Sequence, residues 1–223
     1  MGNFNVISFA DLMQRGESKV DTAQPKPHAI RNQQVPSEGV YIQDVNGKLW
    51  KTEDWDNSAK PNAVAVIAKE DKFLIALTEP LSRPMLSLSY AALEKYMDAT
   101  SSATEAKADY NGAGNTANIL KMMLSTDCAA GYCNAFTFPD GSTKGFLPSL
   151  GQLNLAYQNK AAVDAALSKC GGTAMTNNYY WASTFWGVGS SGYRHCWLLR
   201  WSDGYVYGDG LNYNYRVRPF ANF

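Results

Sequence analysis

The chain has 223 residues, of which 45% are hydrophobic and 18% are charged, with 20 basic residues balancing 20 acidic ones. This composition is enough for a buried core in one large domain, and the lack of net charge argues against a general binder of nucleic acid or anionic membranes. No apolar run is as long as a membrane span, and the N-terminus lacks the basic and apolar regions of a secretory signal. We therefore expect no membrane insertion, no nucleic-acid partner, and folding in the cytosol with reduced, mostly buried cysteines.

The first 38 residues are expected to form an arm that is separate from the main domain. Residues 5–13 have apolar side chains at spacings that favour a short amphipathic element, and a polar stretch with proline and glutamine follows. Such a segment buries little of itself. Two interpretations stay open: an arm for attachment or oligomerisation, or a disordered leader.

After this arm the pattern changes to β-strands. Residues 39–42 and 48–51 flank a turn at 44–47, which predicts an opening hairpin. A second hairpin is predicted from residues 63–68 and 72–77. Both of its strands are almost continuously apolar, so we expect them to be buried on both faces.

The middle of the chain is predicted to be mainly helical. Helices are expected at residues 90–97 and 116–124, with a loop of small residues at 100–115 between them. A short strand is expected at residues 145–148. It leads directly into a stronger helix signal.

That signal is a capping box, the clearest local motif in the chain. Ser149 and Gln152 have its spacing and predict the start of a helix. Asn159 is expected to interrupt the helical pattern before residues 161–169 resume it. The glycine pair at 171–172 then predicts the end of the helical region.

The last 47 residues, 177–223, differ in composition from the rest. They contain no Lys, Glu, Gln or Met, although these four types account for 34 of the preceding 176 residues. They also hold 14 of the 28 aromatic residues. Rigid rings mixed with short polar side chains are typical of binding surfaces. An aromatic-rich β core is the alternative explanation of the same composition.

Four short strands are predicted in this tail, at residues 179–181, 196–201, 205–207 and 216–218. A Ser-Asp-Gly turn follows the second strand, and its glycine supplies the positive φ of a hairpin. Within the second strand, Trp197, Leu199 and Trp201 alternate with Leu198 and Arg200. This alternation predicts one face fixed in the core and one face that is free to vary.

The order of these elements resembles the formylglycine-generating-enzyme-like branch of the C-type lectin fold. The segments that carry the resemblance are GFLPS at 145–149, YWAST at 180–184, WLLRWSDG at 197–204 and RVRPF at 216–220. The opening hairpin is similar to that of related gut-bacterial and gut-phage proteins. The resemblance spans residues 39–223 and implies an α+β domain with short twisted antiparallel sheets, two or three helices and long loops.

Within that branch the chain looks most like the variable proteins targeted by diversity-generating retroelements. In those systems error-prone copying changes adenines, mostly in Asn codons, and the resulting codons cannot encode Lys, Glu, Gln, Met or Trp. The resemblance therefore implies that the missing residue types are a mark of diversification. It implies a constant framework made of Trp181, Trp197, Leu199, Trp201, Gly204, Val206, Arg216, Val217, Arg218 and Phe220.

The same resemblance implies which tail residues face a ligand. The implied ligand-binding positions are Phe185, Tyr193, Arg194, His195, Leu198, Arg200, Ser202, Asp203, Tyr205, Tyr207, Asp209, Tyr213, Asn214 and Tyr215. Gly187 and Ser190 are implied as further diversified positions. These positions alternate with the framework, so that the fold is kept while the surface changes.

No catalytic, metal or cofactor site is expected. Enzymes of this fold oxidise a cysteine with a paired-cysteine copper site, whereas the tail has only Cys196. Neighbouring residues of a strand point to opposite faces, so we expect Cys196 to be buried and His195 exposed, with no contact between them. The remaining cysteines lack the spacing of a zinc site and are expected to be buried thiols. The loop motifs of calcium-dependent lectins are also absent from the tail.

Together, these expectations favour a binding protein over an enzyme. The resemblance favours a phage receptor-binding protein at a tail-fibre tip, located on the virion, whose partner is a bacterial surface protein or glycan. Related phage proteins imply a homotrimer, in which multivalency would strengthen weak single-site binding. The alternatives are a bacterial surface adhesin with a trimmed leader, a structural virion protein with a fixed aromatic interface, and an enzyme of the formylglycine-generating type.

Overall fold

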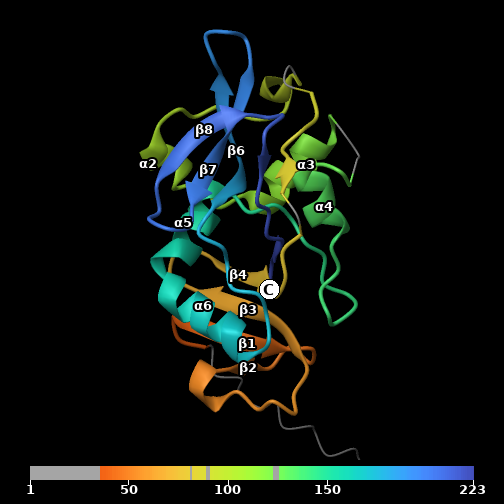
Figure 1. Cartoon of the computed structure of the whole chain (residues 1–223), viewed down its shortest axis with the longest axis vertical. Helices are drawn as coiled ribbons and strands as arrows, with labels where there is room; N and C mark the ends of the chain where they lie inside the picture. The colour runs from red at the N-terminus through yellow and green to blue at the C-terminus, as the bar shows by residue number, and fades with distance from the viewer. Residues whose placement is uncertain (1–35, 81, 89–90, 123–125) are drawn as a thin grey trace, which may run out of the picture. The chain divides into compact units, whose positions relative to one another are not determined.

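Three antiparallel sheets and several helices make up the computed structural model, which describes residues 36–80, 82–88, 91–122 and 126–223 (Figure 1). The α+β class expected from the sequence is confirmed. The predicted N-terminal arm, residues 1–38, lies outside the described residues except for its last three. Residues 36–223 form one compact unit.

The two opening hairpins belong to a five-stranded sheet. Its strands are β1 (Gly39–Asp44), β2 (Leu49–Trp50), β3 (Pro61–Ile67), β4 (Lys72–Ala76) and β10 (Phe220–Ala221), in the order β10-β4-β3-β1-β2. Both predicted hairpins are confirmed, and a 3-10 turn, Thr52–Asp54, follows the first. β10 pairs with the edge of β4, where Phe220 lies opposite Ile75. Residues far apart in the sequence therefore complete one sheet.

Two consecutive helices, α5 (Leu150–Gln158) and α6 (Lys160–Lys169), follow the capping motif. The capping box is confirmed, because the backbone N of Ser149 donates to Oε1 of Gln152 at 3.1 Å. Asn159 separates the helices, and Gly171, with a φ of 76°, ends the helical region. In Figure 1, α6 lies across β1 and β3.

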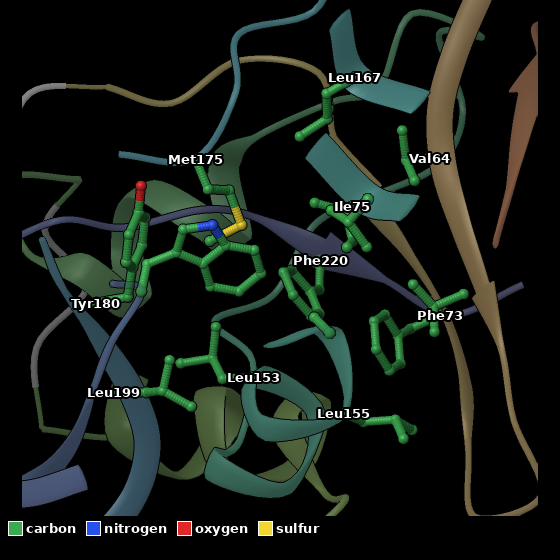
Figure 2. Packing of buried hydrophobic residues seen from close by; sticks show 14 of the residues in the cluster. Val64, Phe73, Ile75, Leu153, Leu155, Leu167, Met175, Tyr180, Leu199 and Phe220 are labelled. Carbon is green, nitrogen blue, oxygen red and sulfur yellow. The ribbon is translucent and has the colours of Figure 1, made fainter. Parts of the chain in front are cut away.

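The strands β3 and β4 are buried on both faces, as their apolar runs predict. On one face Val64 and Ile75 pack with Leu167 of α6 (Figure 2). On the other face Leu74 packs with Phe138. This double burial explains why the two strands show no polar alternation.

The region between β4 and α5 differs most from the prediction. The helix expected at residues 90–97 is a single 3-10 turn, Leu93–Lys95. The expected loop at 100–115 contains α2 (Ala103–Ala106) and the start of α3 (Gly112–Leu120), and a further helix, α4 (Ala129–Ala135), precedes α5. The described residues thus hold five α-helices and not two or three. Among them, no helix combines the length and the apolar character needed to cross a bilayer.

The helix predicted at 116–124 corresponds to α3, which begins four residues earlier. Small residues explain why the start of α3 and the helices α2 and α4 are not predicted. α3 begins at Gly112, where a Cβ atom would lie 2.2 Å from Oε1 of Gln152. Close packing therefore requires glycine at a position where helix propensity favours almost any other residue. The cap of α4 is equally unusual, because Sγ of Cys128 accepts from the backbone N of Gly131 at 3.3 Å. Tertiary contacts define these helices more than local preference does.

The tail forms a three-stranded sheet of β6 (Tyr179–Val188), β7 (Arg194–Arg200) and β8 (Val206–Gly210), and β9 (Asn214–Tyr215) pairs with β5 (Arg83–Pro84). The first three predicted tail strands are confirmed with different bounds. The fourth, at 216–218, is wrong: Arg216 makes only an isolated bridge to Tyr180, and Val217 and Arg218 are buried side chains outside any strand. The short strand expected at 145–148 is likewise only a bridge, between Phe146 and Phe220.

Both faces of the three-stranded sheet are covered along most of β7. Leu199 belongs to the core that α5, α6 and the five-stranded sheet share, where Phe73 stacks on Phe220 with ring centroids 4.8 Å apart (Figure 2). Cys196 and Leu198 belong to a second buried cluster. The face that alternation predicts to be free is therefore mostly core, and β7 reaches the surface only near its ends.

Replacing Gly204 with alanine is expected to destabilise the fold more than the same change at Gly47. The φ angles are 72° and 80°, so each alanine costs about 1–2 kcal/mol of backbone strain. At Gly204 the new Cβ would also lie 2.3 Å from the ring of Tyr157, whereas nothing lies within 4 Å of the Cβ position at Gly47. Urea unfolding of both variants measures the difference, and equal losses would contradict the expected clash.

Candidate functional site

Several of the ligand-binding candidates converge on one end of the three-stranded sheet. In the register of β7 and β8, Leu198 lies opposite Tyr207 and Cys196 opposite Asp209, so these side chains share a face. Arg200 continues the same alternation on β7, and its backbone N donates to the carbonyl of Tyr205 at 2.8 Å. The candidates at every second position are thus brought together by the pleat of the sheet.

We call this surface the tyrosine face and define it by Tyr179, Arg200, Asp203, Tyr205, Tyr207, Asp209 and Tyr215. Its four rings are in contact: the Tyr179 centroid lies 5.1 Å from that of Tyr207 and 5.9 Å from that of Tyr215. The Tyr205 and Tyr207 rings stack at 6.1 Å. Tyr205 is 54% exposed, so its outer ring surface is available to a partner.

Arg200 ties these rings to the hairpin turn. Its guanidinium lies 5.4 Å from the Tyr179 ring and 5.3 Å from the Tyr205 ring, distances typical of cation–π contacts. It also donates two hydrogen bonds to the Asp203 carboxylate, with Nε 2.8 Å from Oδ1. The hydrogen bonds from Arg200 lower the pKa of Asp203 below its ordinary value. The charges of Arg200 and Asp203 are therefore paired with each other, so the exposed ring surfaces are what the face offers to a partner.

A second set of hydrogen bonds holds the rings of Tyr207 and Tyr215. The hydroxyl of Tyr215 donates to Oδ2 of Asp209 at 2.5 Å, and the hydroxyls of Tyr207 and Tyr215 are 2.9 Å apart. Burial, followed by the hydrogen bond to Asp209, raises the pKa of Tyr215 well above its ordinary value. Burial also raises the pKa of Tyr207. Both phenols are therefore neutral at physiological pH, and their positions are set before any ligand arrives.

The remaining candidates fall into two other places. Ser202, Tyr213 and Asn214 are exposed, and Tyr213 is 55% accessible. Tyr193, by contrast, belongs to the loop between β6 and β7, beside Arg194, whose guanidinium pairs with Glu94. The structure therefore divides the candidate residues between the tyrosine face, its exposed neighbours and the opposite end of the sheet.

Three sequence expectations need correction. Phe185 and Leu198, with exposures of 1% and 0%, are core residues and offer no surface to a macromolecular ligand. They pack in the second buried cluster, which covers the face that strand alternation alone leaves open. His195 is half-buried and not exposed, because its ring lies 5.3 Å from that of Trp186.

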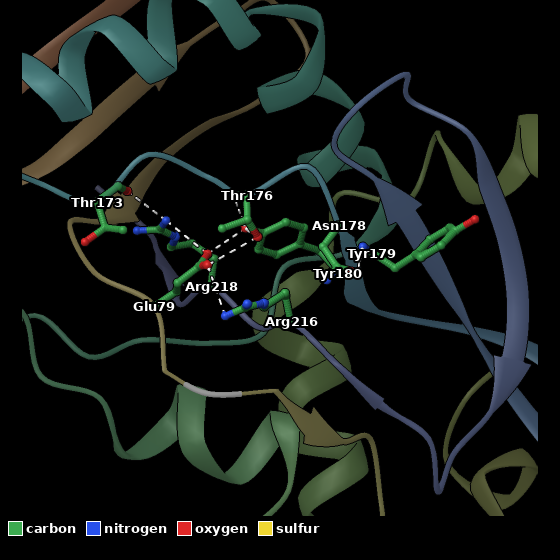
Figure 3. Close-up of polar contacts among 8 residues, drawn as sticks. All are labelled: Glu79, Thr173, Thr176, Asn178, Tyr179, Tyr180, Arg216 and Arg218. Atoms are coloured by element: carbon green, nitrogen blue, oxygen red, sulfur yellow. Dashed lines mark hydrogen bonds and ion pairs between the residues drawn. The ribbon is translucent and has the colours of Figure 1, made fainter.

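One member of the face is not among the predicted ligand-binding residues. Tyr179 is predicted only as a strand residue, although its ring contacts Tyr207, Tyr215 and Arg200. In Figure 3 its side chain points away from that of Tyr180, which is directed at Glu79. The adjacent Tyr-Tyr pair therefore serves two faces of the sheet, and the alternation rule applied to β6 would have found this.

A buried ionic network around Glu79 holds Tyr180 of β6 in place. Arg218 donates through Nη2 to Glu79 at 3.1 Å and to the carbonyl of Thr173 at 2.9 Å, while Tyr180 donates to Glu79 at 2.6 Å (Figure 3). Burial lowers the pKa of Arg218 and the neighbouring Glu79 opposes this change. Arg216 lies 3.6 Å from the other oxygen of Glu79. No local sequence pattern predicts this network, because Glu79 lies far along the chain from the tail residues that it contacts.

Two further observations concern possible chemistry. All four cysteines are buried, as expected, and burial raises the pKa of Cys196 far above that of a reactive thiolate. Over the residues that the structure describes, no three His, Cys, Asp or Glu side chains are grouped to hold a metal ion. The tyrosine face itself offers stacking surfaces and phenolic hydrogen bonds, which suit recognition.

Comparison of the chain with protein-family models, with curated proteins and with solved structures gave no match.

Proposed function

We propose that the protein is a ligand-binding protein and that the tyrosine face, with the adjacent Tyr213 and Asn214, is its binding surface. The observation that carries this proposal is the arrangement of four contacting tyrosine rings around an internally paired arginine. Tyrosine loses little conformational entropy when it is buried by a partner, and rings that are already fixed lose less still. Such a surface is preorganised for contact with a protein or a glycan.

The burial of the framework supports a further part of the proposal, the C-type-lectin-like fold with a diversified tail. Most of the implied framework positions are buried, namely Trp181, Trp197, Leu199, Trp201, Val217, Arg218 and Phe220. By contrast, Ser202, Asp203, Tyr205, Tyr213 and Asn214 are exposed. A tail of this kind can change its surface without changing its core.

The biological setting that we propose rests on the resemblance described above. It is a receptor-binding protein at the tip of a phage tail fibre, directed at a bacterial surface protein or glycan and acting as a homotrimer. Several copies of one weak site would bind a cell surface far more tightly than a single copy.

Sequencing the locus in several isolates tests the diversification. We expect substitutions to concentrate at exposed tail positions, next to a near-copy template and a reverse transcriptase gene. Because Phe185 and Leu198 are core residues, we expect them to stay apolar despite their place in the tail. Substitutions spread evenly over the chain, or as frequent at Leu198 as at Tyr205, would contradict the proposal.

A further inference from the structure

A cavity of about 300 Å³ opens between residues 96–100, the helix α3 and the strand β6. It is separate from the tyrosine face, and its lining includes only one of the candidate ligand-binding positions, the buried Phe185. Its volume is at the lower end of the range for small-molecule sites. A ligand here would be small, and its recognition would depend mostly on residues outside the tail.

Three asparagines of one helix face line the cavity. Asn111, Asn115 and Asn118 are spaced so that their side chains lie along one side of α3. Each amide carries both donors and an acceptor. Asn115 uses its Nδ2 to reach Asp109 at 2.7 Å, and Asn118 uses its Oδ1 to accept from Lys121 at 2.7 Å. The acceptor of Asn115 and the donors of Asn118 have no hydrogen-bond partner among the described residues.

Hydrogen bonds to Asp109 hold several of the lining residues in place. Its Oδ2 accepts from Oγ1 of Thr184 at 2.6 Å and from Asn115, and its Oδ1 accepts from the backbone N of Asn111 at 2.9 Å. Oγ1 of Thr184 in turn accepts from the backbone N of Leu150 at 2.8 Å. The carboxylate of Asp109 thus joins α3 to β6, and Thr184 extends this link to α5. The polar wall keeps its geometry without a ligand.

The charge of the lining restricts the ligand. Asp98 and Asp109 contribute carboxylates, and the described residues that line the cavity include no Lys, Arg or His, which disfavours an anion. A cation is also disfavoured, because the ammonium of Lys121, just outside the lining, contacts Asn118 and lies 5.4 Å from the Tyr96 ring, where it offsets part of the carboxylate charge. A neutral molecule remains as the best electrostatic fit.

The polar and apolar groups of the lining indicate the chemistry of the ligand. Amide donors and acceptors next to carboxylates match an array of hydroxyl groups, each of which both donates and accepts. The ring of Tyr96 and the side chain of Met97 offer apolar surface for the C–H face of such a molecule. We propose that this cavity binds a neutral polyhydroxylated molecule of monosaccharide size. This inference does not depend on the proposed function of the tyrosine face.

Titration of ¹⁵N-labelled protein with neutral polyols tests the inference. The probes are glucose, galactose, mannose and myo-inositol, with methylammonium and inorganic phosphate as charged comparators. We expect at least one polyol to shift the side-chain amide resonances of Asn111, Asn115 and Asn118 in a saturable manner. Replacing Asn111 or Asp98 with alanine should weaken that binding at least about tenfold, since each variant removes hydrogen bonds to the ligand. Both residues are exposed, so neither variant should impair folding.

Two matched variants separate this site from others. Asn134→Ala changes an exposed asparagine of α4 outside the cavity lining, and Tyr205→Ala changes the tyrosine face. Both should bind the polyol with unchanged affinity. The inference is overturned if no polyol gives saturable shifts, if only methylammonium or phosphate binds, or if Asn111→Ala and Asp98→Ala bind the polyol as well as Asn134→Ala does.

Discussion

Replacing Arg218 with methionine is expected to lower the free energy of unfolding by about 3–5 kcal/mol, the usual cost of removing one partner of a buried ion pair. The Arg218 side chain is fully buried and Glu79 is 4% exposed, so the change leaves a carboxylate with little access to water. It also removes the hydrogen bonds from Arg218 to the carbonyls of Ala76 and Thr173. Urea unfolding followed by tryptophan fluorescence measures the loss.

Arg216→Met is the matched control for this prediction. Arg216 contacts the same carboxylate, but at 3.6 Å and with a side chain that is 30% exposed. The control should therefore lose much less stability than Arg218→Met, because Glu79 keeps its closer partner. If both variants unfold at the same urea concentration, the buried pair does not have the structural role assigned to it.

Replacing Tyr205 with alanine is expected to weaken ligand binding about 30-fold or more, because an aromatic hot-spot residue typically contributes at least about 2 kcal/mol. Tyr205 is the most exposed ring of the tyrosine face and stacks on Tyr207. The measurement is flow cytometry of labelled protein on a panel of intact bacterial strains, using a strain that the unaltered protein binds. Unfolding in urea should be nearly unchanged, since the ring buries little surface in the isolated chain.

Phe223→Ala provides the control for the binding experiment. Phe223 is an exposed aromatic residue of the same tail, but its ring lies 5.5 Å from Nζ of Lys72, beside the five-stranded sheet. Its removal should leave cell binding intact. Equal losses for both variants would show that the tyrosine face is not the specific contact surface.

The sequence predicts those parts of the fold that depend on local patterns. The opening hairpins follow from apolar runs separated by polar turns, and the capping motif at Ser149 marks the start of α5 correctly. The turn at Gly204 is also correct, because a positive φ there requires glycine. In each case a few neighbouring residues contain the whole signal.

The errors have a common physical origin in long-range packing. Strand alternation identifies two faces of β7, but it cannot show that a second cluster covers the face of Leu198. Similarly, α3 begins with a glycine that only close packing against Gln152, Phe146 and Ser149 explains. The cavity beside α3 and the partnership of Arg218 with Glu79 join segments that are distant in sequence, so no local pattern predicts them.

The pairing of β10 with β4 has a consequence for protein synthesis. Arg218 bonds to Ala76 across 142 residues of sequence, and Phe220 occupies the edge of β4. A ribosome that meets a premature stop codon, or shifts its reading frame within the tail, releases a chain without this strand and with Glu79 lacking its closest cation. Such a product cannot complete the five-stranded sheet. The integrity of this sheet therefore depends on an intact reading frame through Ala221.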